Sequence, residues 1–122
     1  LDRIEPIFFA EGTRSTRRDL VEPFRERLAR MDPTSLGHAV DAVIFRRRDL
    51  RDQLARIDLP TLVLVGAEDR ATPPSRARAI RRGVPGASLV EVPRAGHLSA
   101  LEQPEPVNAA LLELLDGVNG GP

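Results

Sequence analysis

The sequence has no cysteine and only two histidines among its 122 residues. Without cysteine the chain can form no disulfide, no thiol nucleophile and no cysteine-based metal site, and two isolated histidines are too few for a typical zinc site. Lysine is absent too, so all 18 basic residues are arginines. Nothing in the sequence implies a metal or an organic cofactor.

The chain also lacks an excess of charge of either sign, because 18 basic residues balance 18 acidic ones. Nucleic-acid binding normally needs a one-sided basic surface, so no nucleic-acid partner is expected. The longest apolar runs, around Leu62–Val65 and Ala109–Leu115, are far shorter than a membrane span, and the first residues do not resemble a signal peptide. These absences favour a cytoplasmic protein without a membrane partner.

The length limits the number of domains. A chain of 122 residues fits one domain or part of one, and two full domains are not expected. The chain begins with Leu1 rather than methionine, so we expect the true N-terminus to lie upstream.

The first part of the chain has the spacing of amphipathic helices. Between Thr16 and Met31 apolar residues recur at steps of three and four, with arginine and glutamate between them. Thr16 and Asp19 have the spacing of a capping box, which would start this helix.

A second helix is predicted after Asp32-Pro33, with Thr34 or Ser35 as its cap. Arg46–Arg48 fall at its C-terminal end, where cations interact favourably with the helix dipole. The apolar spacing of residues 50–57 predicts a third, short helix before Pro60.

The pattern changes after Pro60. Thr61–Val65 is a continuous β-branched and aliphatic run closed by Gly66, as expected of a strand covered on both faces in a parallel sheet. Ser75–Gly83 predicts a helix, and Ser88–Val92 predicts a second strand. The order strand, helix, strand indicates a parallel α/β unit with a right-handed crossover.

A loop from Pro93 to Ser99 is expected after the second strand, and the apolar stripe from Val107 to Leu115 predicts a last helix. Gly117 is expected to end this helix, and residues 118–122 to form a flexible tail. Isolated pairs of strands are marginal in water. We therefore expect the sheet to be incomplete in this chain and to be completed by something else.

Two polar residues follow the two predicted strands. Asp69 lies in the turn after the first strand, and His97 lies in the loop after the second, 28 positions later. Ligands of open α/β sheets bind beyond the carboxyl ends of the strands, and a strand-helix-strand unit of about 30 residues returns the chain to the same edge. The spacing therefore predicts a hydrogen bond between Asp69 and His97.

An imidazole held by a carboxylate has its tautomer fixed and its protonated form stabilised, as a general base requires. A third residue must provide the attacking oxygen, but none of the five serines has the glycine-flanked G-x-S-x-G elbow that exposes a catalytic hydroxyl. Ser99 is the only serine near His97, and no sharp strand-to-helix turn exposes it. We expect the nucleophile to be absent from this chain.

Two runs of the sequence resemble the C-terminal segment of α/β-hydrolases, in particular bacterial esterase-like and 3-oxoadipate enol-lactonase-like members: IDLPTLVLVGAEDRATPPSRARAI and PGASLVEVPRAGHLSALEQPEPVNAALLELL. In that family the triad acid lies in P-x-L-x-x-x-G-x-x-D, followed soon by T-P, and here this position is Asp69. The triad histidine lies in G-H, followed by E-x-P, and here it is His97, with Glu102 and Pro104 behind it.

The resemblance implies an α/β fold and a hydrolase of small-molecule esters or lactones, in which Asp69 orients His97 and a serine outside this chain attacks the carbonyl. Residues 57–117 would form the C-terminal part of the core. Residues 1–56 resemble more loosely the helical cap that these enzymes insert, and 118–122 would be the tail. The nucleophile elbow, the oxyanion-hole loop and the first strands are absent, so the chain is expected to be inactive alone.

Other residues near these motifs have simpler interpretations. Glu68 is a rival acid beside Asp69, but the family pattern places the carboxylate one residue later. Glu102 is expected to be a structural hydrogen-bonding residue, and His38 to be solvated on a cap helix. Arg70 and Leu98 could line a substrate pocket because each adjoins one of the two motif residues.

Three alternatives stay open at this stage. The chain could be a noncatalytic α/β-hydrolase-like fragment or binding module that pairs its open strand edge with another copy or with a missing N-terminal half. A serine in the elbow would favour an esterase or lactonase, whereas an aspartate would favour a dehalogenase or epoxide hydrolase. The same fold also includes cofactor-free haloperoxidase-like enzymes.

Overall fold

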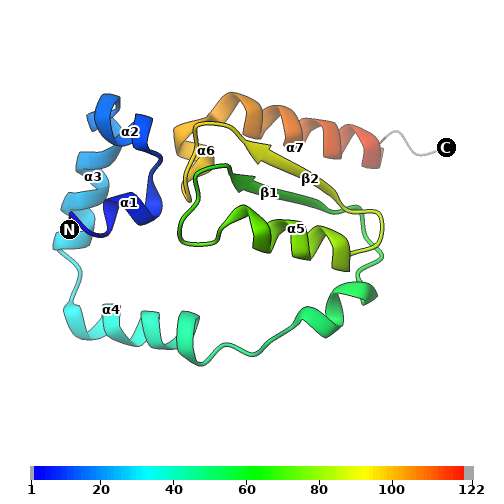
Figure 1. Ribbon diagram of the computed structural model, residues 1–122, viewed down its shortest axis with the longest axis horizontal. Helices are drawn as coiled ribbons and strands as arrows, with labels where there is room; N and C mark the ends of the chain where they lie inside the picture. Colours follow the sequence, from blue (N-terminus) through cyan, green and yellow to red (C-terminus); the bar gives the residue numbers. More distant parts are fainter. Residues whose placement is uncertain (1, 120–122) are drawn as a thin grey trace.

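A computed structural model describes residues 2–119 of the chain (Figure 1). A helical N-terminal part leads into a small sheet flanked by helices. In chain order the elements are α1 (Glu5–Phe8), α2 (Glu11–Thr16), α3 (Arg18–Ala29), α4 (Pro33–Val40), the π-helical η1 (Asp41–Phe45), the 3-10 helix η2 (Arg51–Arg56), β1 (Leu62–Gly66), α5 (Pro74–Gly83), β2 (Ser88–Val92), α6 (Ser99–Glu102) and α7 (Pro104–Asn119).

The two strands form a parallel sheet in the order β1-β2, with Leu62 paired to Ser88 and Gly66 to Val92. α5 connects them, so the predicted strand, helix, strand unit is confirmed, with the first strand displaced by one residue. Among residues 2–119 the other edge of β1 has no partner strand, as expected of an incomplete sheet.

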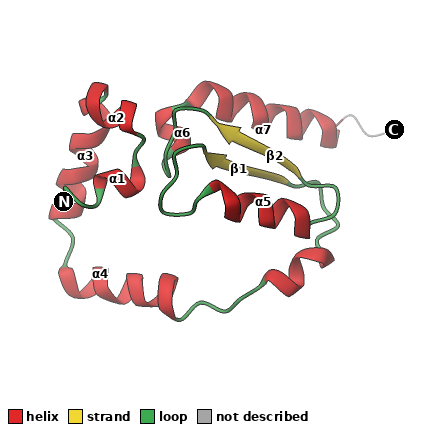
Figure 2. Ribbon diagram, viewed as in Figure 1, coloured by secondary structure: helices red, strands yellow, loops and turns green. Residues whose placement is uncertain are grey.

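Helices cover both faces of the sheet, α5 on one side and α7 on the other (Figure 2). α7 packs through Val107 and Ala110, which are both buried, while Leu111 and Leu115 of the same predicted stripe are exposed. The central cluster consists of buried residues from β2, the loop after it and α7, with partly buried residues of the two strands against them: Val92, Ala95, Val107, Leu64 and Val90. This core fixes the strand ends from which the candidate site begins.

The N-terminal helices pack around aromatic rings. Phe24 of α3 lies 5.4 Å from Phe8 and 5.2 Å from Phe9, centroid to centroid, and Phe9 is only 2% exposed. Arg25 of α3 pairs with the buried Glu5 of α1. The sequence analysis did not predict α1 and α2, yet α1 lies beside the predicted histidine loop.

The segment from α4 to η1 is mostly exposed, and only Leu36 and Asp41 are half-buried. Neither α4 nor η1 has a buried residue, and the apolar side chains of Val43, Ile44 and Phe45 are 62%, 63% and 75% exposed. In Figure 1 this segment lies at the lower left, apart from the sheet, and the chain that follows it passes below α5. These three apolar side chains therefore have little cover within the described residues.

The predicted capping box at Thr16 is wrong. The Thr16 hydroxyl donates to the carbonyl of Gly12 at 2.8 Å, so this residue ends α2 and is not available to cap α3. The N-cap of α3 is Arg17, which makes no side-chain capping bond, and Asp19 instead accepts hydrogen bonds from the Arg17 guanidinium.

The predicted cap of the second helix is wrong by two or three positions. Asp32 occupies the N-cap of α4, and its carboxylate accepts a hydrogen bond of 2.7 Å from the Ser35 N–H. Pro33 suits the first helical position, where its missing N–H would have no partner anyway. The third short helix is present as η2, which is a 3-10 helix.

The last helix extends past the predicted stop at Gly117. α7 begins at Pro104 and continues to Asn119, because glycine costs a helix only about 1 kcal/mol and does not by itself end one. Residues 118 and 119 are therefore helical rather than part of a tail, and 120–122 lie outside the described residues.

Candidate active site

The loops after β1 and β2 meet at the carboxyl edge of the sheet. The Ala67 N–H donates to the Val92 carbonyl at 2.9 Å, and the Glu68 N–H donates to the Ala95 carbonyl at 2.9 Å. These backbone bonds extend the pairing of the strands beyond their ends. The two loops therefore start from a fixed relative position.

Glycine permits the close approach of these loops. A Cβ on Gly66 would overlap the carbonyl oxygens of Ala95 and Gly96 and would lie 2.7 Å from the Ala95 carbonyl carbon. A Cβ on Gly96 would lie 2.7 Å from the Ala10 nitrogen and 2.8 Å from the Phe8 oxygen. Glycine is therefore required at both positions because the neighbouring backbone leaves no room for a Cβ, and not because the φ angle is unusual.

Asp69 and His97 meet where these loops converge. His97 Nδ1 lies 2.9 Å from Asp69 Oδ2, which confirms the hydrogen bond that the spacing predicted. The Asp69 side chain is 4% exposed, and that of His97 is 35% exposed. The carboxylate is therefore shielded from water, while the imidazole reaches the surface of the site.

Thr72 gives Asp69 two further hydrogen bonds. The Thr72 N–H donates to Oδ1 at 2.8 Å, and its hydroxyl donates to Oδ2 at 2.9 Å. Burial by itself raises the pKa of Asp69, but the bonds from the Thr72 N–H, from His97 and from the Thr72 hydroxyl together lower that pKa below its usual value. Asp69 is therefore held as a carboxylate.

Phe8 holds the histidine loop from the N-terminal side. Its carbonyl oxygen accepts the N–H groups of His97 at 2.8 Å and Leu98 at 3.2 Å. Its ring meets the His97 imidazole edge-on, with 5.4 Å between centroids and an interplanar angle of 74°. The sequence analysis missed this contact, since no local pattern links Phe8 to His97.

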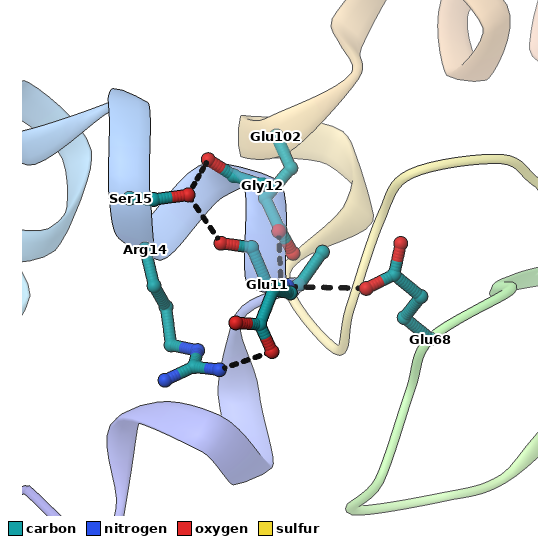
Figure 3. A network of polar contacts seen from close by, with 7 residues as sticks. Glu11, Gly12, Arg14, Ser15, Glu68 and Glu102 are labelled. Atoms are coloured by element: carbon teal, nitrogen blue, oxygen red, sulfur yellow. Dashed lines mark hydrogen bonds and ion pairs between the residues drawn. The ribbon is translucent and has the colours of Figure 1, made fainter.

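Glu102 joins the same two segments. Its buried carboxylate accepts the Ala10 N–H through Oε2 and the Gly96 N–H through Oε1, each at 2.8 Å. Its predicted structural role as a hydrogen-bonding residue agrees with these bonds. Glu68 does not bond to His97; its carboxylate accepts the Glu11 N–H at 3.1 Å on the exposed side of the network (Figure 3).

A hollow of about 1140 Å³ adjoins the pair. Asp69, Thr72 and His97 line it together with Ser99, apolar side chains of β1 and α5, and charged residues from the segment before β1. Arg70 and Leu98 do not belong to this lining, so their contact with a substrate stays a prediction. The Ser99 hydroxyl, in the described part of the chain, makes no hydrogen bond to His97.

His38 is exposed on α4, as expected, and does not belong to the lining of the hollow.

Within residues 2–119 no group of three or more histidine, aspartate or glutamate side chains is arranged to hold a metal ion. In the same range, no helix combines the length and the apolar character needed to cross a membrane.

The chemistry of the pair follows from its hydrogen bonds. An ionised carboxylate only accepts, so Nδ1 of His97 must be the nitrogen that bears hydrogen. In the neutral ring the other nitrogen, Nε2, then has a free lone pair that can accept a proton. An imidazole whose tautomer is fixed by a carboxylate in this way has the chemistry that a general base requires.

Comparison with known proteins identifies the family. The alpha/beta hydrolase family matches residues 2–110. A thermophilic esterase from Thermogutta terrifontis, solved with malate bound, is similar over 96% of this chain and 43% of its own, with 33% identity and a TM-score of 0.85. A hydrolase from Pseudomonas aeruginosa is similar over 93% of this chain and 42% of its own, with 36% identity and a TM-score of 0.81.

Among curated proteins, a pimeloyl-[acyl-carrier protein] methyl ester esterase from Neisseria meningitidis is 34% identical over 86 residues, which is 70% of this chain and 33% of that protein. The chain spans about a third of the length of the curated relatives it matches. With the family match over most of its residues and with these structural neighbours, the chain belongs to the alpha/beta hydrolase family, as the two sequence motifs predicted.

Proposed function

We propose that this chain provides the acid and the base of a Ser-Asp-His triad that hydrolyses ester or lactone bonds, with the nucleophile outside the sequence. Asp69 orients His97, and His97 Nε2 takes the proton of the attacking hydroxyl and later returns it to the leaving group. The observation that supports this role most directly is the 2.9 Å bond between His97 Nδ1 and the shielded Asp69 carboxylate, at the wall of a large hollow.

The comparisons support the reaction class. Two of the similar proteins are esterases by name. Since the chain spans less than half of these proteins, the proposed activity is that of a completed enzyme, and little or none is expected of the chain alone. The substrate is a small molecule, which the segment preceding β1 helps to select.

An ester assay tests the proposal. The purified chain should not hydrolyse p-nitrophenyl acetate, whereas the chain joined to the sequence encoded upstream of Leu1 should do so. In that joined protein His97→Ala should lower turnover by about 10³-fold or more. The matched control is His38→Ala, because His38 does not line the hollow; this variant should leave turnover unchanged.

Two results would contradict the proposal. If turnover in the joined protein survives His97→Ala, then His97 is not the general base. Turnover by the chain alone that depends on His97 would place the nucleophile inside it, where Ser99 is the nearest candidate. The upstream sequence provides an independent test, because a glycine-flanked serine after a strand is expected there.

Within residues 2–119 one edge of β1 has no partner strand, and this supports a second candidate, a noncatalytic module that associates through this edge. That reading requires a stable assembly, with a second copy or with an N-terminal half, and no turnover in either. Sedimentation of the chain with and without the upstream segment, combined with the ester assay, separates the two proposals.

A further inference from the structure

We propose that Thr72 is a positioning residue of the triad, whose hydroxyl fixes the Asp69 carboxylate and favours the His97 tautomer with hydrogen on Nδ1. This inference rests on the proposed function, since it concerns how the acid orients the base. It assigns to Thr72 a role beyond turn formation.

Thr72 fixes the orientation of the Asp69 carboxylate. Thr72 bonds both oxygens of Asp69, Oδ1 through its N–H at 2.8 Å and Oδ2 through its hydroxyl at 2.9 Å. Two donors from one residue fix rotation about the last bond of the aspartate side chain. Oδ2 is thereby directed at His97 Nδ1, which lies 2.9 Å away.

The second step concerns the imidazole itself. The Thr72 hydroxyl oxygen lies 3.4 Å from His97 Nδ1. Because an ionised carboxylate is the stronger acceptor, the Thr72 hydroxyl donates its proton in a hydrogen bond to Asp69, and the hydroxyl oxygen presents its lone pairs to the ring. Nδ1 therefore faces two oxygen atoms, which favours hydrogen on this nitrogen and leaves Nε2 free to act as the base.

A purely structural role would look different. Threonine hydroxyls often bond to nearby groups simply to stabilise a turn, and such a bond would not alter the ring of another loop. Thr72 is exposed, so its hydroxyl could otherwise be satisfied by water. The tautomer of His97 is thus the observable that separates positioning from turn formation.

The test uses the 122-residue chain and does not need catalysis. The chain has only two histidines, so His38 is an internal reference for ¹⁵N chemical shifts of the ring nitrogens. At alkaline pH, where an ordinary imidazole is neutral, these shifts give the ratio of the two tautomers. Thr72→Val keeps the N–H and the shape of the side chain but removes the hydroxyl.

The expected result is a fall of roughly two- to tenfold in the ratio of Nδ1–H to Nε2–H in His97, the factor for one net hydrogen bond. Thr72→Ser, which keeps the hydroxyl, should retain the wild-type ratio. In ¹³C titrations Thr72→Val should also raise the pKa of Asp69, and Thr72→Ser should not. His38 should be unchanged in both variants.

One further variant keeps the inference open to refutation. Thr72→Ala is a second hydroxyl-free variant; if both it and Thr72→Val unfold, the role is structural and the inference is wrong. An unchanged ratio in Thr72→Val, or an equal fall in Thr72→Ser, would also overturn it.

Asp69→Asn separates this inference from the proposed function. The substitution should reverse the tautomer of His97, because the amide no longer requires hydrogen on Nδ1. If Asp69→Asn leaves the ratio unchanged, the pair does not form and the proposed function fails. If Asp69→Asn reverses it but Thr72→Val has no effect, only the role of Thr72 is removed.

The other charged groups that line the same hollow remain in place in every variant, so they cannot cause the differences: Arg47, Arg48, Asp49, Arg51 and Arg76.

Discussion

Two regions of the molecule differ sharply in how deeply their side chains are buried and in how many hydrogen bonds their polar groups make. The first, which we call the corner, comprises residues 8–11, 66–72 and 95–102. Counted over the whole residue, Glu102 is 4% exposed and Asp69 is 6% exposed, and their carboxylates accept several hydrogen bonds. The second, the arm, comprises residues 32–50, where no residue is buried and Phe45 is 75% exposed.

The difference shows which part of the site the chain can organise by itself. In the corner, backbone N–H groups from segments far apart in sequence meet carboxylates and carbonyls at hydrogen-bonding distance, so Asp69 and His97 are held together by this chain itself. In the arm, an amphipathic stripe exists but covers nothing. Matched substitutions in the two regions should therefore have very different effects on the free energy of unfolding.

The largest contrast is expected from the same substitution at two glycines. Gly66→Ala in the corner should lower the free energy of unfolding by roughly 4 kcal/mol, because its Cβ would overlap the carbonyls of Ala95 and Gly96 and the backbone must move. Gly37→Ala in the arm meets nothing within 4 Å and lies inside α4, so it should raise stability by up to about 1 kcal/mol. Urea unfolding measures both, and a change of the same sign in both would break the comparison.

A smaller effect is expected from the buried carboxylate. Glu102→Ala leaves the N–H groups of Ala10 and Gly96 buried without a partner and should cost about 3 kcal/mol. Glu68→Ala is the matched control within the corner, since this carboxylate is exposed and accepts a single N–H, from Glu11; it should cost less than about 1 kcal/mol. Equal losses in urea unfolding would show that burial is not what distinguishes the two.

The apolar counterpart compares two valines. Val92 is 0% exposed in the central core, and Val92→Ala removes two buried methyl groups and leaves a cavity, at a cost of about 2 kcal/mol. Val43 in the arm is 62% exposed, and Val43→Ala should change stability by less than about 0.5 kcal/mol. A loss at Val43 as large as that at Val92 in the same denaturation assay would mean that the arm is covered in solution.

The parts of the fold that could be predicted are those with a local cause. Thr61–Val65 is a continuous β-branched and aliphatic run, and Ser88–Val92 is a short run with three apolar residues. The spacing of these two runs alone placed Asp69 and His97 at one edge of the sheet. The third hydrogen-bonding partner, Thr72, had a local signal too, because a threonine three positions after an aspartate can bond back to it.

The contacts that could not be predicted join segments with no shared periodicity. The bond from the Ala10 N–H to Glu102 spans 92 positions, and only the folded corner brings these residues together. The boundary errors have another origin: at Thr16 and Gly117 a local preference is real but small, and the competing helical hydrogen bonds outweigh it.

The smallest effect is expected from the ionisation of Asp69, because the cost of burial offsets much of the gain from its hydrogen bonds. Its pKa is lower in the folded chain than in the unfolded one. Above the unfolded value of about 3.9 both states are ionised, and the stabilisation is fully present. As the pH falls toward the folded pKa, the unfolded state binds a proton first, so this stabilisation is lost.

Asp69→Asn removes the titrating group, so the free energy of unfolding of the variant should fall less steeply than that of the wild type below pH of about 4. Urea unfolding at a series of pH values measures the free energy of unfolding of both proteins. In the difference between wild type and variant, the contributions of the other acidic groups cancel. The matched substitution in the arm is Asp32→Asn, since the Ser35 N–H and side chain also lower the pKa of Asp32. A steeper loss in Asp69→Asn than in the wild type would show that burial, and not hydrogen bonding, dominates at the corner.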